Sequence, residues 1–429
     1  MTALIWSISL LVCLSGNMIP SFAEDSTPPV TDVASRILQY LDASDGDEAE
    51  RLLQGILSDR SASVETVSQT IKAERIYQSQ PLGHLPDEQI VSRGQTYGLS
   101  LFIPPTYRTS KAYALVVCLH GYGFTGEEYL ERWRTRLGED YLLACPTYPS
   151  GAWFTRRAED LVLETIRQAK RRYHVDPDRV FLTGMSNGGI GAWLIGMHHA
   201  PLFAGLAPMA SGLDNVLMPF LANLRNTPVY IIHGTKDQVM PVDLSRSIVR
   251  ELDLLGYPHV YREHQREHPI AGGHYFPKEE LPDLVDWFGH QRREPLPARL
   301  TIVRDGSHFQ AFNWVRLDST DPIAAFSDDL VDKRDERIKR RVYARLDASM
   351  VGHNRIEVKA EHVQRYSLFL NAQLIDFSKP LTVVTNGRLS FEGVVIPSVE
   401  TLLRQARLRH DPERLFPVHL TIDLAKPAS

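Results

Sequence analysis

The sequence has few cysteines, no excess of basic charge and no apolar run long enough to span a bilayer. Of its 429 residues, 3 are cysteine, and the formal net charge is −5. The chain has no basic excess to hold a phosphate backbone, which argues against nucleic acid as a partner. Hydrophobic residues make up 43% of the chain and charged residues 23%, values typical of a globular protein long enough for two domains.

The longest apolar stretch at the N-terminus covers residues 3–14 and is followed by Pro20. Roughly twelve apolar residues are too few to cross a membrane. Small residues precede Glu24, so the segment is predicted to be a signal peptide cleaved after Ala23, with export to the periplasm or beyond and no stable membrane insertion afterwards. No Lys or Arg precedes the run, which leaves only the α-amino group as positive charge. A lipid anchor on Cys13 is an open alternative, although Val12 fits a lipoprotein signal poorly.

Two cysteines remain after that cleavage, Cys118 and Cys145. They lie in the apolar runs LVVCLH and LLACP. Such runs are typical of buried strands, and free cysteine is among the most buried residue types. We therefore expect two buried, unpaired thiols in preference to a disulfide.

The stretch RVFLTGMSNGGIGA, residues 179–192, combines a short apolar β-run, a glycine-flanked serine and a segment compatible with a helix. A serine between a strand and a helix occupies a strained turn, and glycines two residues to either side let the strand and helix approach each other. The pattern therefore predicts that Ser186 is an exposed nucleophile at the end of a strand.

Strand and helix signals alternate on both sides of this serine, which predicts a parallel sheet covered by helices on both faces. In such sheets, ligands bind beyond the carboxyl ends of the strands. Expected strands cover residues 97–103, 113–119, 141–145, 180–182, 203–209, 229–232 and 259–262; helices are expected over 155–173 and 242–255, and helical spacing also recurs over 32–75.

The loop His120-Gly121-Tyr122-Gly123 directly follows the strand YALVVCL. Acyl transfer develops negative charge on the carbonyl oxygen, and loss of one N–H donor aimed at it costs about 3–4 kcal/mol. We expect the backbone N–H groups of Tyr122 and Asn187 to supply this oxyanion hole. The alternative is an ordinary glycine loop in which Tyr122 only covers the core.

A carboxylate is needed to orient the catalytic base. Asp237 follows the strand VYII within HGTKD, 237 − 186 = 51 positions after the serine. Asp214, in a loop after PMASG, and Asp243, at the start of a helix, are rival candidates. The position of Asp237 at a strand end favours it as the acid.

The order serine, acid, histidine requires a base downstream of Asp237. His274 lies in the glycine loop AGGH, and the rivals His264 and His268 lie in the strand-like and charged segments before it, where we expect solvated surface. The i, i+4 spacing of His264 and His268 could indicate a metal site, but the Gly- and Pro-rich surroundings do not support a continuous helix there.

Together, RVFLTGMSNGG, PVYIIHGTKDQVMPV and the later GGH resemble the α/β-hydrolase superfamily, over roughly Gly94 to Gln291. Within it the chain is most similar to secreted esterases and predicted peptidases related to dienelactone hydrolases, feruloyl esterases and polyhydroxybutyrate depolymerases. The resemblance implies a doubly wound, mostly parallel sheet, a Ser186–His274–Asp237 triad, and an oxyanion hole at Tyr122 and Asn187, with no metal or organic cofactor. One departure is the insertion REHQREHPIA before GGH, which is longer and more charged than in the family.

The expected domain plan has four parts: a signal peptide at 1–23, a short helical segment at 24–93, an α/β-hydrolase catalytic domain at 94–294, and a β-rich accessory domain at 295–429. After Pro295-Leu296-Pro297 short strands are expected, typical of a sandwich, and the charged run 328–341 is expected to be solvated. Phe312 and Trp314 are expected in its core in preference to a polymer-binding face. The strands expected in it cover 300–304, 313–317, 341–346, 355–358, 381–384 and 419–422.

The sequence thus predicts an exported serine hydrolase that cleaves a carboxylic ester, small or polymeric, through an acyl-enzyme. Two alternatives stay open. One is a serine peptidase or amidase of the prolyl-oligopeptidase-like type. The other is a non-catalytic protein that binds a polymer or cell wall on a hydrolase scaffold. The oligomeric state is also left open.

Overall fold

The computed structural model describes residues 33–43, 46–73, 77–307 and 311–424. The expected signal peptide, its cleavage after Ala23 and the alternative of an anchor on Cys13 lie outside the described residues. Among the residues that are described, no helix is both long and apolar enough to cross a membrane.

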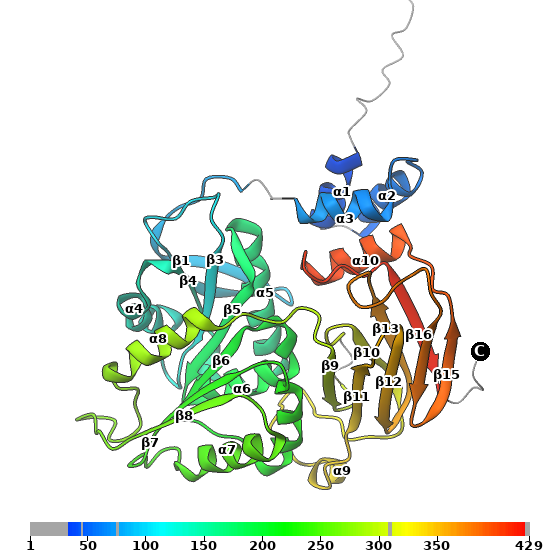
Figure 1. Ribbon diagram of the computed structural model, residues 1–429. Helices are drawn as coiled ribbons and strands as arrows, with labels where there is room; N and C mark the ends of the chain where they lie inside the picture. The colour runs from blue at the N-terminus through cyan, green and yellow to red at the C-terminus, as the bar shows by residue number, and fades with distance from the viewer. Residues whose placement is uncertain (1–32, 44–45, 74–76, 308–310, 425–429) are drawn as a thin grey trace, which may run out of the picture.

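The central feature is an eight-stranded sheet with the strand order β1-β2-β4-β3-β5-β6-β7-β8 (Figure 1). From β4 to β8 neighbouring strands run parallel, whereas β1 and β2 form an antiparallel hairpin at one edge and β2 also pairs antiparallel with β4. The expected mostly parallel sheet is confirmed. Its strands are β1 (Gly83–Ser92), β2 (Gln95–Ile103), β3 (Tyr113–Leu119), β4 (Tyr141–Pro146), β5 (Val175–Met185), β6 (Gly205–Met209), β7 (Val229–Gly234) and β8 (His259–His264).

Helices cover both faces of this sheet, because the strand side chains are apolar on both sides. All seven residues of β3 are buried, for example. Residues of α5, α6 and α7 join one buried apolar cluster, and those of α4 and α8 join another on the opposite face. The helices are α4 (Gly126–Leu137), α5 (Arg156–Arg172), α6 (Asn187–His198), α7 (Asp243–Leu255) and α8 (Leu281–His290), with 3₁₀ turns η1 (Gly138–Asp140), η2 (Pro149–Gly151), η3 (Ala200–Leu202), η4 (Asn215–Leu224) and η5 (Lys278–Glu280).

Strand β1 was not expected, since residues 24–93 were predicted to be helical. Buried and exposed side chains alternate only near the end of β1, and most of its side chains are partly or fully exposed. An edge strand of this kind carries little apolar signal. It is held in place by its hairpin with β2, whose turn uses Arg93 and Gly94 at positive φ of 48° and 73°.

The C-terminal part contains a three-stranded sheet, β10-β13-β16, and a five-stranded sheet, β15-β14-β12-β11-β9. The β-rich character is as expected, and Phe312 and Trp314 are buried in the core as predicted. Strands β13 and β15 and helix α10 were not anticipated. The elements are β9 (Arg299–Arg304), β10 (Val315–Thr320), α9 (Glu336–Lys339), β11 (Ala344–Met350), β12 (Arg355–Glu361), β13 (Val363–Leu370), β14 (Leu381–Thr385), β15 (Arg388–Gly393), α10 (Val399–Arg409) and β16 (Val418–Asp423).

The three N-terminal helices lie on α10 (Figure 1). These helices are α1 (Val33–Asp42), α2 (Gly46–Leu57) and α3 (Val64–Lys72). Their apolar faces and that of α10 form one buried cluster around Ile37, Leu53 and Leu402. The N-terminal helices therefore complete the C-terminal part of the molecule.

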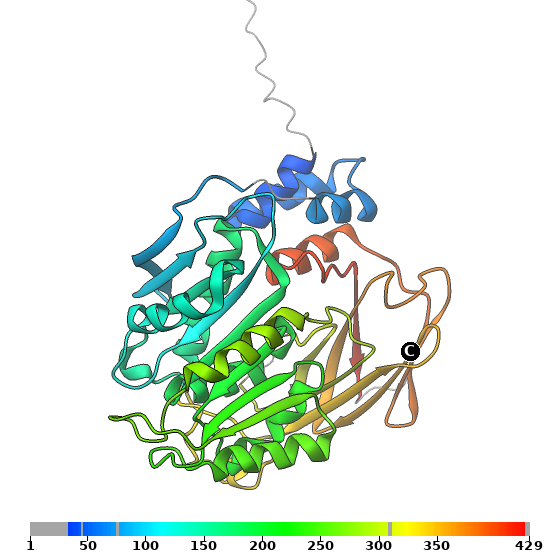
Figure 2. The ribbon, with the colours of Figure 1, turned by 60° about the vertical axis from the view of Figure 1, so that its left-hand side comes forward.

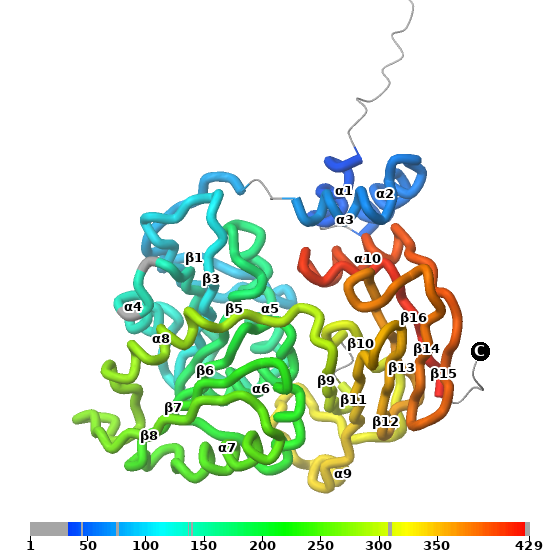
Figure 3. The backbone as a smooth tube through the Cα atoms, in the orientation of Figure 1, coloured from blue at the N-terminus to red at the C-terminus, as the bar shows by residue number. Residues whose placement is uncertain are grey.

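The β-rich part is also joined to the α/β part through a shared core. After α8 the chain passes to β9 (Figure 3). Strand β9 lies beside η4. The Asn223 side chain donates to the Val303 carbonyl at 3.1 Å and accepts the Val303 N–H at 2.6 Å. A single apolar cluster includes buried residues from both parts.

Candidate functional site

Ser186 lies at a sharp turn between β5 and α6, as the sequence predicts. Its φ of 60° and ψ of −124° are strained for a residue with a side chain. A Cβ added at Gly188 would lie 2.0 Å from the Leu119 carbonyl oxygen, so only glycine lets α6 approach β3 this closely. The Ser186 N–H donates to the Met209 carbonyl at 3.0 Å, which fixes the turn against β6.

Asp237 and His274 are brought together from the loops after β7 and β8, and His274 Nδ1 lies 2.7 Å from Asp237 Oδ2. The other carboxylate oxygen accepts the N–H groups of Val239 and Met240 at 2.9 and 2.8 Å. Burial raises the pKa of Asp237, but hydrogen bonds from His233, His274 and the Met240 N–H outweigh it and hold the pKa well below its usual range. The carboxylate is therefore ionised at neutral pH and accepts the Nδ1 proton of His274.

The rival carboxylates have other partners. Asp214 caps η4 by accepting the Val216 N–H and pairs with Lys333. Asp243 opens α7 and pairs with Arg246 at 3.1 Å. Neither lines the cavity that contains Ser186.

The rival histidines also differ from His274. His264 is buried, with Nε2 3.1 Å from the Tyr275 carbonyl, so the expectation that it is solvated surface was wrong. It ends β8 beneath the loop that carries His274. His268 is exposed as expected, and its backbone exchanges two hydrogen bonds with Gly272, at 2.7 and 2.9 Å. The charged insertion therefore forms a compact turn ahead of His274.

Ser186 and His274 line the same cavity, whose volume is about 650 Å³. No hydrogen bond joins the Ser186 hydroxyl to His274 in the described part of the chain. Catalytic hydrogen bonds of free enzymes often tighten only when substrate binds. The lining is mainly apolar and aromatic and includes Tyr122, Phe124, Trp133, Met185, Met209, Val239, Ile270 and Phe276.

The loop with Tyr122 is positioned by its first residue, His120, to which the sequence analysis gave no role of its own. His120 is fully buried; its Nε2 accepts the Tyr148 N–H at 3.0 Å, which places the proton on Nδ1, 2.9 Å from the Gly121 carbonyl. Burial lowers the pKa of His120, in agreement with a neutral ring. Tyr122 itself is 71% exposed at the cavity mouth. Asn187 is the first residue of α6, where the backbone N–H has no partner within the helix.

His233 is a second residue that the sequence analysis left without a role. It is fully buried at the end of β7, and its Nε2 lies 3.3 Å from Asp237 Oδ2 and 2.7 Å from the Met240 carbonyl. Its Nδ1 lies 2.7 Å from the Ser245 hydroxyl. His233 therefore contacts the same carboxylate oxygen as His274. The only sequence signal was its place in HGTKD, four residues before Asp237.

Comparison with known proteins identifies a relative that is similar in sequence. No protein-family model matches the chain. The chain is 26% identical to acyl-protein thioesterase 1 of Gibberella zeae over 222 residues, which is 42% of this chain and 92% of the relative. Solved structures similar to it include a thermostable esterase (TM-score 0.42, 25% identity, 49% of this chain and 63% of that one) and a ferulic acid esterase (TM-score 0.39, 15% identity, 49% and 98%).

The strand order, the turn at Ser186 and the relative in sequence agree. The chain has the α/β-hydrolase fold. It is a hydrolytic enzyme of the serine hydrolase class, as the sequence predicted. The sequence match covers 42% of this chain.

Proposed function

We propose that the protein is a serine esterase that uses Ser186 as nucleophile, His274 as general base and Asp237 as the acid that orients the base. The observation that carries the proposal is the 2.7 Å contact between His274 and Asp237 at the wall of the cavity that also contains the strained Ser186. With Nδ1 held by the carboxylate, Nε2 of His274 is the nitrogen left to take a proton.

In the proposed reaction the Ser186 hydroxyl attacks the ester carbonyl while His274 takes its proton. The negative charge on the carbonyl oxygen is stabilised by the N–H groups of Tyr122 and Asn187. The C–O bond to the alcohol then breaks, and His274 returns the proton to the departing alcohol. Water attacks the acyl-serine by the same route, releases the carboxylic acid and regenerates Ser186.

The apolar lining of the cavity favours an ester with an aromatic or aliphatic group. The name of the sequence relative adds acyl thioesters to the substrates worth testing. A peptidase or amidase needs recognition of the peptide backbone, and no motif in the sequence dictates such specificity. The other alternative is a non-catalytic protein that uses the C-terminal part to bind a polymer. A reactive Ser186 would exclude this alternative.

The test combines a fluorophosphonate probe with a panel of p-nitrophenyl esters, feruloylated and acetylated sugars, acyl thioesters and aminoacyl amides. Wild type should be labelled on Ser186, and Ser186→Ala should not. His274→Ala should lower turnover by several orders of magnitude. The matched control is His268→Ala, an exposed histidine at the same cavity, which should stay active. An unlabelled wild type would refute the esterase proposal, and preference for amides would favour the peptidase.

We also propose that the chain is exported, with cleavage after Ala23. The support is the apolar segment 3–14 followed by small residues before Glu24. N-terminal sequencing of protein recovered from the periplasm or medium should begin at Glu24. Recovery with Met1 from the cytoplasm would contradict export, and a lipid-modified N-terminal cysteine would favour the anchor at Cys13.

A further inference from the structure

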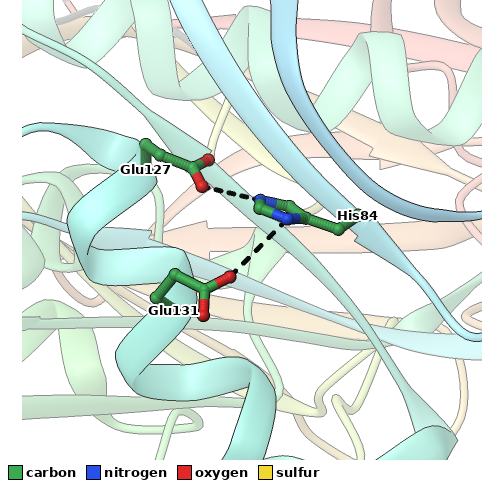
Figure 4. Close-up of side chains that lie close together, drawn as sticks. All are labelled: His84, Glu127 and Glu131. Carbon is green, nitrogen blue, oxygen red and sulfur yellow. Dashed lines mark ion pairs between the residues drawn. The ribbon is translucent and has the colours of Figure 1, made fainter.

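Three metal-ligating side chains meet between the edge of the sheet and α4. His84 lies near the start of β1, and Glu127 and Glu131 lie one turn apart on the facing side of α4 (Figure 4). Each offers one ligand atom, and the three atoms lie within 4.8 Å of one another. This cluster lies outside the cavity of Ser186.

The contacts within the cluster leave one carboxylate oxygen without a partner. His84 Nε2 lies 2.7 Å from Glu127 Oε1, and Nδ1 lies 3.6 Å from Glu131 Oε1. The contact of His84 Nε2 with Glu127 Oε1 is an ion pair that lacks hydrogen-bond geometry, and the second carboxylate oxygen, Glu127 Oε2, is buried without a hydrogen-bond partner. A buried carboxylate oxygen without a hydrogen bond is costly, and a bound cation would account for Glu127 Oε2.

We propose that His84, Glu127 and Glu131 bind a divalent transition-metal ion, with Zn²⁺ as the ion that fits best. Imidazole nitrogen together with carboxylate oxygen is a ligand set for zinc, whereas magnesium and calcium prefer oxygen alone. Three protein ligands leave a fourth tetrahedral position for water. The two carboxylates carry negative charge, which a divalent cation compensates.

The distances between the ligand atoms are close to those that such an ion requires. Zinc bonds of about 2.1 Å set tetrahedral ligand atoms about 3.4 Å apart. His84 Nδ1 and Glu131 Oε1 lie 3.6 Å apart. The closer contact of His84 with Glu127 can lengthen if the Glu127 carboxylate rotates, since its second oxygen has no hydrogen-bond partner to hold it. Arg134 pairs with the other oxygen of Glu131 at 3.1 Å and so orients this ligand.

The position of α4 gives the ion a role in holding the cavity wall. The opposite side of this helix contributes Tyr129 and Trp133 to the lining of the cavity. The helix begins just after the loop with Tyr122, where Thr125 forms a capping box with Glu128. An ion between β1 and α4 would therefore fix the helix that follows the proposed oxyanion loop.

The test is calorimetric titration of Zn²⁺ into untagged, EDTA-treated and desalted full-length protein. We expect one site in wild type and at least a tenfold weaker affinity in His84→Ala, Glu127→Gln and Glu131→Gln. Zn²⁺ should raise the melting temperature of wild type and leave that of His84→Ala unchanged. Mg²⁺ should not bind. The two glutamine variants keep the side-chain shape, and circular dichroism checks that every variant is folded.

The matched control is His290→Ala, which removes an exposed histidine whose Nδ1 lies 2.8 Å from the Asp286 carbonyl and 3.6 Å from its carboxylate. This variant should bind Zn²⁺ as wild type does. Ser186→Ala and His274→Ala should also bind normally, so failure of the esterase proposal would not affect this result. Absence of Zn²⁺ binding to wild type, or equal affinity in wild type and His84→Ala, would show that the cluster is an ion pair only.

Discussion

Ser186 carries a backbone strain that the rest of the site depends on. A φ of 60° with a ψ of −124° costs on the order of 1–3 kcal/mol for a residue with a side chain. The strain persists because β5, α6 and the Met209 carbonyl fix the turn on all sides. It places the hydroxyl at the cavity, beyond the end of the strand.

This strain predicts that glycine is more stable than alanine at position 186, although both variants lack the hydroxyl. Glycine adopts positive φ at no steric cost, whereas alanine keeps the Cβ. We expect Ser186→Gly to exceed Ser186→Ala in free energy of unfolding by about 1 kcal/mol. Urea denaturation of the two inactive proteins measures this difference. A glycine variant less stable than the alanine variant would mean that the turn carries no strain.

His233 is predicted to position Asp237 and not to touch substrate. His233→Phe removes one donor to the carboxylate, while His233→Gln retains a donor near the same place. The phenylalanine variant should lose about tenfold in kcat with KM unchanged, because a lost hydrogen bond of about 1.4 kcal/mol is a factor of ten. Glutamine should restore most of the loss. A change in KM alone would place His233 in substrate binding instead.

The same substitution should alter stability in a pH-dependent way. The depressed pKa of Asp237 contributes stability that is fully present above its unfolded pKa of about 3.9 and is lost as the pH falls through the folded value. His233→Phe moves the folded pKa upward, toward the unfolded one. The stability gap between wild type and this variant should therefore be largest near pH 7 and shrink below about pH 4.

At the scale of elements, the approach of α6 to the sheet depends on glycine. A Cβ at Gly188 would overlap the backbone carbonyl of Leu119, and backbone cannot move aside as a flexible side chain can. Gly188→Ala should therefore destabilise the protein by about 3 kcal/mol or prevent folding. The control is Gly289→Ala in α8, where an added Cβ meets nothing within 4 Å. Thermal melts should separate the two variants, and equal melting temperatures would contradict the close approach.

Elements with a strong local signal could be predicted from the sequence, and those stabilised mainly by distant partners could not. The central strands are fully buried apolar runs, and the turn at Ser186 is marked by glycines. Strand β1 and helix α10 lack such a signal, since β1 is a largely exposed edge and α10 has an apolar face covered by the N-terminal helices. His264 lies in a charged segment, yet the Tyr275 carbonyl from a later loop covers it.

At the scale of the whole molecule, the α/β part and the β-rich part share their interior. The buried Arg293 guanidinium, near the expected boundary, bonds to Asp178 on one side and to Asp411 on the other. The pKa of Asp411 is raised by burial, but the guanidinium groups of Arg414 and Arg293 hold it far below its usual range. Removing one partner from such a buried cluster leaves uncompensated charge, which costs about 3–5 kcal/mol.

These contacts change what is expected of a chain cut at Pro295. The sequence places Ser186, Asp237 and His274 before the cut, which predicts a truncated protein that still hydrolyses small esters. The structure shows that the cut would expose the apolar surface beneath β9 and leave the Arg293 guanidinium without Asp411. We therefore expect residues 24–294 alone to be insoluble or to lack a cooperative melt, because buried charge and apolar surface both become exposed.

The milder version of this experiment keeps the whole chain. Asn223→Ala removes both hydrogen bonds to Val303 and should lower the melting temperature while the protein still unfolds in one transition. Small-ester activity should then fall in parallel with the folded fraction, and polymeric esters should be affected no more strongly. A soluble, cooperatively folded 24–294 fragment that hydrolyses small esters but not polymers would contradict this expectation, because it would make the β-rich part a separate substrate-holding domain.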